Sequence, residues 1–207
     1  GADAVIPVED THLKRLEPDS ALPATVAVFR SIEAGAYIRP KGQDIQIGQA
    51  LLPATRRLAP QDIGVLAMQG LSSVPVYRRP KIGLLSSGDE LVPVGEPLTS
   101  GKIYESNSYV LQALINQNGA ESLSLGTGAD TFAAIKALFD QAVDSGVDLI
   151  LSSAGVSMGA YDYIRTVIEQ NGTLKLWRVN MRPGKPLTFG DYEGVPVIGL
   201  PGNPVSA

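Results

Sequence analysis

Four acidic side chains in this chain of 207 residues stand beside Ser-, Gly- and Pro-rich segments, and together they could hold a hard cation. Carboxylate oxygens are the ligands that Mg²⁺ prefers in proteins. Two cationic side chains, Arg182 and Lys185 in the segment NMRPGKP, could bind an anion such as phosphate. Because Mg²⁺ can bridge carboxylates to a phosphate, this combination predicts Mg²⁺-assisted attack on a phosphoanhydride. The four acids are Asp89, Glu90, Asp130 and Asp162.

The segment SSAGVSMGAYD, residues 152–162, is the most informative loop. It follows the short apolar run 147–151 and precedes 163–170, whose apolar positions fit one face of a helix. A loop of small residues between a buried strand and a helix N-terminus presents backbone N–H groups and Ser hydroxyls to an anion. An ordinary turn between a strand and a helix would explain the same residues, so the loop alone leaves both interpretations open.

Alternating strands and helices are predicted from Lys81 onward, and they would position these segments. The alternation is typical of an α/β fold, a parallel sheet with helices on both faces that binds ligands at the carboxyl ends of its strands. Four polar loops would meet at that edge: 86–91, 152–162, 180–186 and 201–206. The candidate strands are 82–85, 122–125, 147–151, 174–179, 187–189 and 195–200, and the candidate helices are 109–117, 163–170 and one that Asp130 could cap.

The region before Pro80 has a different pattern. Short apolar runs at 4–8, 25–29, 36–38 and 50–52 are separated by Gly and Pro, which predicts a small, mostly β module. One helix interrupts it, beginning near Pro60 and ending at Gly70. We therefore expect two domains, 1–79 and 80–207. Because the chain begins at Gly1 without a Met and stops at Ala207 within a helix-start pattern, we also expect a fragment of a longer protein.

Composition excludes several classes of protein. Hydrophobic residues make up 44% of the chain and charged residues 18%, which is typical of a soluble globular protein. The net charge of −4 does not support a nucleic-acid partner, and with no Cys and one His a disulfide or a Cys/His zinc site is excluded. No apolar run approaches the roughly 20 residues of a membrane span, and no signal peptide is visible. We expect a cytoplasmic enzyme or binding protein without a membrane partner.

Four motifs follow one another in the chain: SSGDEL, SSAGVSMG, MRPGKP and GLPGNPVSA. In that order they resemble the molybdopterin molybdenumtransferase family, which includes gephyrin. The resemblance covers essentially the whole chain, from GADAVIPVEDT onward, and implies that the family's C-terminal domain and part of its N-terminal region lie outside it. The family catalyses the last step of molybdenum-cofactor synthesis, in which adenylylated molybdopterin is cleaved with Mg²⁺, molybdate joins the dithiolene and AMP leaves. The resemblance also implies a homodimer, with the adenylyltransferase and molybdoenzyme acceptors as further partners.

The resemblance places the substrate pocket at the four loops and at Ser106-Asn107. From their chemistry, we expect Asp89, Glu90 and Asp162 to be catalytic and to bind Mg²⁺. We expect Lys185 to be catalytic and, with Arg182, to face the phosphates or the molybdate. Ser153 and Ser157 would donate hydrogen bonds to phosphate or to the pterin. The substrate-binding set is Ser87, Gly88, Ser106, Asn107, Asp130, Ser153, Gly155, Val156, Ser157, Met158, Gly159, Arg182, Pro183, Gly184, Pro186, Pro201, Gly202, Asn203, Pro204 and Ser206.

Two departures from the family pattern keep other readings open. Ala154 stands where the family usually has Gly, and Glu105 stands where Asp is commoner. The alternative enzyme is the molybdopterin adenylyltransferase, against which the β-rich region and the MRPGKP loop argue. The alternative without catalysis is a pterin-binding or scaffold paralogue, as in gephyrin. The sequence does not distinguish molybdate from tungstate, because the two oxyanions have nearly the same size.

Overall fold

The computed structural model describes residues 2–15, 19–21, 23–153 and 162–207. Its contacts divide the chain into two units, Gly1–Pro75 and Val76–Ala207. The division falls just before the connector 78–81, which belongs to the second unit. All four polar loops predicted from the sequence therefore lie in the second unit.

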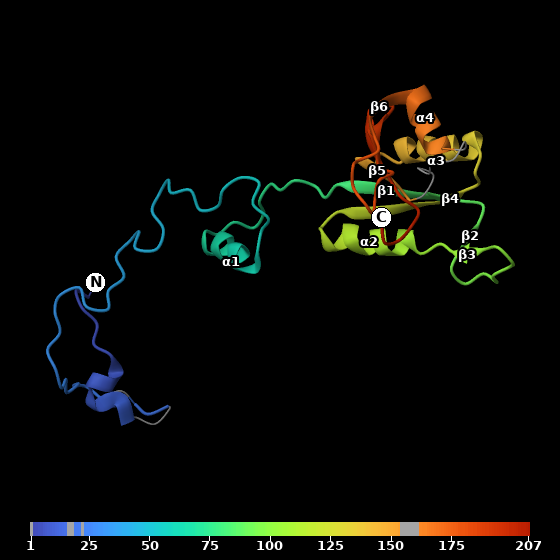
Figure 1. The fold of residues 1–207 in the computed structure, drawn as a ribbon. Helices are drawn as coiled ribbons and strands as arrows, with labels where there is room; N and C mark the ends of the chain where they lie inside the picture. The colour runs from blue at the N-terminus through green and yellow to red at the C-terminus, as the bar shows by residue number, and fades with distance from the viewer. Residues whose placement is uncertain (1, 16–18, 22, 154–161) are drawn as a thin grey trace. The chain divides into compact units, whose positions relative to one another are not determined.

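A six-stranded sheet forms the centre of the second unit (Figure 1). Its strands, in order across the sheet, are β4 (Glu121–Gly128), β1 (Lys81–Ser87), β5 (Leu149–Ser153), β8 (Val195–Leu200), β7 (Thr188–Tyr192) and β6 (Gly172–Trp177). The first four strands are parallel, whereas β7 is antiparallel to both β8 and β6. This mostly parallel sheet confirms the predicted α/β fold class. A separate short pair, β2 (Leu91–Val92) and β3 (Ile103–Tyr104), lies between β1 and the next helix in the chain.

Helices cover both faces of the sheet (Figure 1). On one face α2 (Asn107–Gln117) packs with Leu111 and Ile115 against Leu84 of β1. On the other face α3 (Phe132–Asp144) and α4 (Tyr163–Asn171) share a larger core that includes Phe139 and Ile164, both fully buried. Burial of one such side chain contributes about 1.5–3 kcal/mol to the free energy of folding. The two helix layers therefore stabilise the strands from whose ends the polar loops emerge. No helix in the described part of the chain is long and apolar enough to cross a membrane.

The start of α3 differs from the prediction. Thr131 is the N-cap, with an extended backbone and its hydroxyl oxygen accepting from the Ala134 N–H at 3.3 Å. Asp130 was expected to cap this helix, but its carboxylate accepts instead from the backbone N–H of Asp89, at 3.3 Å. Since Thr is a good N-cap residue and stands one position later, it takes the capping role and leaves Asp130 in the loop.

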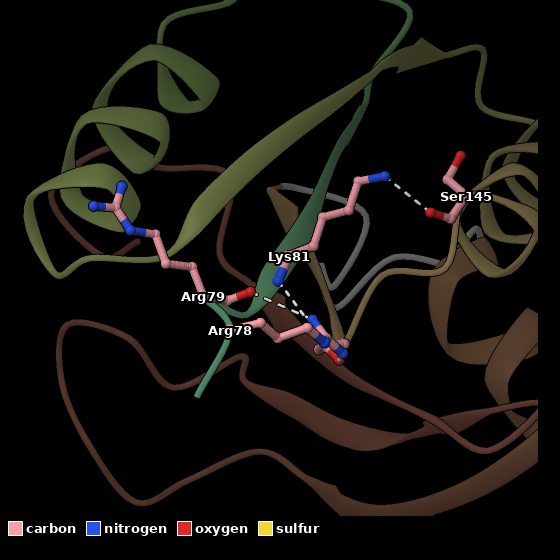
Figure 2. A network of polar contacts seen from close by, with 5 residues as sticks. Arg78, Arg79, Lys81 and Ser145 are labelled. Atoms are coloured by element: carbon pink, nitrogen blue, oxygen red, sulfur yellow. Dashed lines mark hydrogen bonds and ion pairs between the residues drawn. The ribbon is translucent and has the colours of Figure 1, made fainter. Parts of the chain in front are cut away.

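Hydrogen bonds attach the connector 78–81 to the amino-terminal edge of the sheet. Figure 2 shows Arg78, Arg79, Lys81 and Ser145 at this edge. Arg78 forms two hydrogen bonds to the carboxylate of Asp148, one of them at 2.6 Å, and this carboxylate also accepts from the Lys81 backbone N–H at 2.8 Å. The ammonium group of Lys81 donates to the Ser145 carbonyl at 2.9 Å. The hydrogen bonds from Arg78 hold the pKa of Asp148 at about 2. These contacts anchor the connector on the side of the sheet opposite to the polar loops.

The first unit does not show the expected β module in its described residues. It contains two 3-10 helices, Val8–Asp10 and His12–Arg15, and the predicted helix α1 (Pro60–Met68). Its extended segments meet at one isolated bridge, between Thr11 and Val28. The apolar runs are only three to five residues long and are separated by Gly and Pro. They pair through a few backbone hydrogen bonds, such as the one from the Val5 N–H to the Ala36 carbonyl at 3.0 Å, rather than as strands of a sheet.

Candidate active site

The topology of the sheet brings the four polar loops to one edge. β1, β5 and β8 are parallel, so the loops after them emerge at their common carboxyl end. β6 also ends there, because Trp177 pairs with Thr188 and Thr188 pairs with Gly199 of β8. The connection 178–187 therefore lies at the same edge of the sheet as the loops that follow β1, β5 and β8. Ligands of α/β sheets bind at this edge.

Gly184 shows how closely two of these loops approach. Its φ of +100° favours glycine, and a Cβ built there would lie 2.9 Å from the Met181 side chain and 3.6 Å from the carbonyl oxygen of Ser206. The loop 180–186 therefore folds tightly on itself beside the end of the loop 201–206. The positive φ therefore favours glycine here, whereas the flexible Met181 side chain could move aside and 3.6 Å is an ordinary contact.

Unpaired polar atoms gather at the same edge. In the described part of the chain, four buried side-chain polar atoms have no hydrogen-bond partner: Ser152 Oγ, Asp162 Oδ2, Trp177 Nε1 and Thr188 Oγ1. Ser152, Thr188 and Trp177 belong to one row across the sheet, completed by Gly199, and Asp162 precedes α4. A buried polar group without a partner costs free energy, so such groups are kept where a ligand or water can pair with them.

Asp162 combines a structural contact with a free oxygen. Its Oδ1 accepts from the Arg165 backbone N–H at 3.0 Å and caps α4, whereas its Oδ2 is buried without a partner among the described residues. Burial raises the pKa of Asp162, and the hydrogen bond from Arg165 only partly opposes this. The free oxygen can therefore meet a cation or a donor at the helix N-terminus.

Asp89 and Asp130 form a reciprocal pair between the loops after β1 and β4. The Asp130 N–H donates to Asp89 Oδ1 at 3.1 Å, and the Asp89 N–H donates to Asp130 Oδ2 at 3.3 Å. Lys102 also donates to the Asp89 backbone carbonyl. Each carboxylate keeps one oxygen outside this pair, and both side chains are exposed, so both can reach a bound ligand.

Glu90 lies against the backbone of Gly88, where a Cβ would come within 2.7 Å of its carboxylate. The φ of +148° at Gly88 favours the Gly of the SSGDEL motif, since the exposed Glu90 side chain could move aside. Over residues 2–15, 19–21, 23–153 and 162–207, no group of three or more Asp, Glu or His side chains is placed to hold a metal ion. The predicted trio of Asp89, Glu90 and Asp162 is therefore not a preassembled metal site.

Cationic side chains line the β6–β7 side of the edge. Arg182 and Lys185 are exposed and form no ion pair with a described residue. Two guanidinium groups lie over the ring of Trp177, with Arg178 Cζ at 3.7 Å and Arg165 Cζ at 4.0 Å from its centre. Arg165 is also paired with Glu169 at 2.8 Å, so Arg178 is the one of the two whose N–H groups could bind an anion while it stacks on the ring.

A short polar segment, Glu105–Ser108, reaches the ends of two strands, β1 and β8. The Glu105 carboxylate, with the residue only 7% exposed, accepts from Ser86 of β1 at 3.3 Å and from the Ser108 N–H at 3.0 Å. Asn107 donates to the carbonyl of Gly202, beyond β8, at 2.8 Å. The Asn107 amide, predicted to bind substrate, therefore holds the loop 201–206 in place. Sequence reasoning missed the roles of Ser86, Glu105 and Ser108, although four consecutive polar residues after a strand were a usable signal.

The other predicted residues are distributed along the same edge. Ser106 is the N-cap of α2 and is exposed, with a hydroxyl that forms no capping bond. Asn203 Oδ1 accepts from the Val205 N–H at 3.0 Å and closes the last turn. Ser87, Ser153 and Pro201 are buried, Pro186 and Ser206 are half-buried, and Pro183, Gly202 and Pro204 are exposed. The predicted residues Gly155, Val156, Ser157, Met158 and Gly159 lie outside the described residues.

Comparisons with known proteins agree with this arrangement. Residues 83–207 match the family described as "Probable molybdopterin binding domain", and residues 1–70 match "MoeA N-terminal region (domain I and II)". The molybdopterin molybdenumtransferase of Haemophilus influenzae is 37% identical over 207 residues, which cover 100% of this chain and 49% of the relative. The enzyme of the same name from Nostoc is 37% identical over 210 residues, which cover 100% of this chain and 46% of that relative.

A solved structure supports the same relationship. The molybdopterin biosynthesis moeA protein from Pyrococcus horikosii superposes with a TM-score of 0.80 at 33% identity. The match covers 99% of this chain and 49% of that protein. This chain thus spans about half the length of the relatives that it matches.

Proposed function

Because the chain belongs to the molybdopterin molybdenumtransferase family, we propose that it forms the pterin-binding part of an enzyme that inserts molybdenum into molybdopterin. The observation that carries the proposal is the row of unpaired buried polar atoms beside the four motif loops at the carboxyl edge of the sheet. A ligand that offers both donors and acceptors, as a pterin and a phosphate do together, would satisfy these atoms.

The proposed substrate is adenylylated molybdopterin, and the proposed reaction cleaves its phosphoanhydride, joins molybdate to the dithiolene and releases AMP. Arg182 and Lys185 would bind the phosphates or the molybdate, since they are exposed cations beside the loops. Asp162, with one free oxygen at the N-terminus of α4, would orient the reacting phosphate or its metal ion. The dithiolate sulfurs come from the substrate, because the chain has no Cys.

Mg²⁺ fits this edge as part of a complex with the substrate. Mg²⁺ in phosphate chemistry is commonly held by one or two carboxylates together with substrate phosphates and water. The Asp89–Asp130 pair offers two exposed carboxylates, and Asp162 Oδ2 offers a buried one. When bound, Mg²⁺ would neutralise phosphate charge and make the phosphorus easier to attack. The absence of a trio among the described residues favours binding of Mg²⁺ together with the phosphates.

A cytoplasmic location and a homodimer belong to the same proposal, and both rest on the family resemblance. The adenylyltransferase and the molybdoenzyme acceptors are the proposed protein partners on the same ground. Each can be tested separately from the chemistry, the dimer by light scattering and the partners by pulldown with the purified proteins.

Calorimetry with adenylylated molybdopterin, with and without Mg²⁺, tests the proposed function. Molybdate is then added and AMP is measured by chromatography. We expect binding that Mg²⁺ strengthens, followed by AMP release. Binding without release would keep the pterin site and place a required element outside this chain. A folded chain that does not bind the substrate would contradict the proposal, and ATP consumption with pyrophosphate release would favour an adenylyltransferase.

A further inference from the structure

A chain of hydroxyl groups runs beneath the candidate site and ends at a buried carboxylate. Ser86 Oγ lies 2.8 Å from Ser153 Oγ, 3.0 Å from Ser108 Oγ and 3.3 Å from Glu105 Oε1. Ser86 and Ser153 are register partners at the ends of β1 and β5. The three residues Ser86, Ser153 and Glu105 are 0%, 2% and 7% exposed, so water does not compete for these contacts.

The carboxylate of Glu105 determines which group donates in each hydrogen bond of this chain of hydroxyl groups. Ser86 has one proton and three oxygen neighbours, and an ionised Glu105 can only accept. If the Ser86 proton pointed to Ser153, the lone pairs of Ser86 and the carboxylate would face each other in a buried site, which is unfavourable. The proton of Ser86 therefore goes to Glu105, and Ser108 and Ser153 donate to Ser86.

From this order we infer that Glu105 is a positioning residue, which acts through Ser86 to make Ser153 a hydrogen-bond acceptor toward the ligand. The Ser153 hydroxyl donates its proton to Ser86, so only the lone pairs of Ser153 Oγ remain for a hydrogen bond with the ligand. Ser153 is the last residue of β5, at the edge where ligands of such sheets bind. A phosphate oxygen, which needs a donor, does not suit this position.

The group that Ser153 recognises is thus an N–H or an amino group. This inference rests on the proposed function, in which both the pterin ring and the adenine of the substrate carry such donors. We assign the contact to the pterin, and the test below separates it from a contact with the adenylyl part. The assignment differs from the expectation that Ser153 donates a hydrogen bond to phosphate or to the pterin. The phosphates are left to Arg182 and Lys185, which are exposed on the neighbouring loop.

Two probes separate these roles: pterin without a phosphate group, and AMP, each titrated into the purified chain by calorimetry. Ser153→Ala should weaken pterin binding about three- to tenfold, the effect of one neutral hydrogen bond, and change AMP binding by less than about twofold. Ser153→Thr, which keeps the hydroxyl, should restore pterin binding. Loss of AMP binding with intact pterin binding in Ser153→Ala would mean that Ser153 contacts the adenylyl part and not the pterin, which overturns the inference.

Glu105→Gln tests the positioning role, because an amide carries both a donor and an acceptor and no longer imposes a proton direction. Pterin binding should weaken in the same range, whereas Glu96→Gln, at an exposed position of the same unit, should behave as wild type. If Glu105→Gln does not fold, Ser86→Ala breaks the same chain of hydroxyl groups. By freeing the Ser153 proton, it should weaken pterin binding and change AMP binding by less than about twofold.

The outcomes distinguish this inference from the proposed function. A folded wild-type chain that binds neither pterin nor AMP contradicts both. A wild-type chain that binds pterin, with affinity unchanged in Ser153→Ala, Glu105→Gln and Ser86→Ala, contradicts the inference alone.

Discussion

Asp162 should contribute to stability and to activity through different oxygens, and two substitutions can separate these contributions. Asp162→Ala removes the N-cap of α4, in which Oδ1 accepts from the Arg165 N–H at 3.0 Å. Loss of such a cap costs about 1 kcal/mol, which lowers the melting temperature of a unit of this size by about 3–4 °C. Asp162→Asn keeps an oxygen for the cap and removes only the charge.

The pKa of Asp162 predicts whether the charge of this side chain raises or lowers the stability of the fold. Burial raises it above the ordinary 3.8, so the unfolded chain loses its proton first as the pH rises, and the charged side chain costs stability above that pH. Asp162→Asn should therefore be at least as stable as wild type at pH 7. Its advantage should shrink as the pH falls through the raised pKa toward 3.8. Magnesium-dependent AMP release should be lost in both variants.

Urea unfolding at several pH values, followed by circular dichroism, and chromatography of AMP provide the assay. Asp162→Ser, which caps without a charge, is the matched control and should resemble Asp162→Asn in both measurements. AMP release at the wild-type rate by Asp162→Asn would refute the catalytic role of the charge. Equal stability of Asp162→Ala and Asp162→Asn would refute the cap.

Three further predictions concern other parts of the second unit. Arg182→Ala and Lys185→Ala should each weaken AMP binding about tenfold by calorimetry, with unfolding free energy within about 0.5 kcal/mol of wild type, since neither side chain pairs with a described residue. Gly190→Ala should destabilise the fold by about 1–3 kcal/mol in urea unfolding, because its Cβ would lie 2.4 Å from a carbonyl oxygen of β6; wild-type stability would contradict this packing. The depressed pKa of Asp148, about 2 against 3.8 unfolded, stabilises the fold above pH 3.8, and this stabilisation is lost as the pH falls toward 2. Arg78→Met should remove that part of the acid dependence, and an unchanged profile of stability between pH 2 and 5 would argue against the ion pair.

The elements of the second unit were predictable because each has a strong local pattern. The helix 163–170 was expected from its apolar positions and is observed as Tyr163–Asn171. The strand 195–200 is observed with the expected bounds. The start of α3 was less certain, because Asp130 and Thr131 are both good caps and only the contact with Asp89 decides between them.

The direction of β7 was not foreseen, although the chain contains the cue. The connection between β6 and β7 spans 178–187, which is too short for the crossover of a dozen or more residues that parallel neighbours need. No regular strand forms in the described residues of the first unit, so the mostly β module at 1–79 stays a prediction. Short apolar runs indicate strands only when a partner runs beside them. Sequence alone contains no information on which distant run supplies that partner.

The sequence motifs predicted which loops form the candidate site, but they did not predict the contacts between its side chains. The order of the motifs indicated the loops, and their residues lie at one edge of the sheet. The hydroxyl contact of Ser86 with Ser153 and the stacking of Arg165 on Trp177 join residues 67 and 12 positions apart, so no spacing rule reveals them. The same holds for Asn107, whose amide is used on Gly202.

The hairpin β6–β7 has a consequence for how this fold can diversify. The connection between β6 and β7 leads from strand to strand, with no helix packed on the core between them. The connection 178–187 joins two antiparallel strands on one side of the sheet, with β6 at its margin, and both of its ends are held by backbone hydrogen bonds. Insertions there would leave the parallel strands and their helices in place. Divergence of anion selectivity among related chains, including molybdate against tungstate, should therefore concentrate in this hairpin.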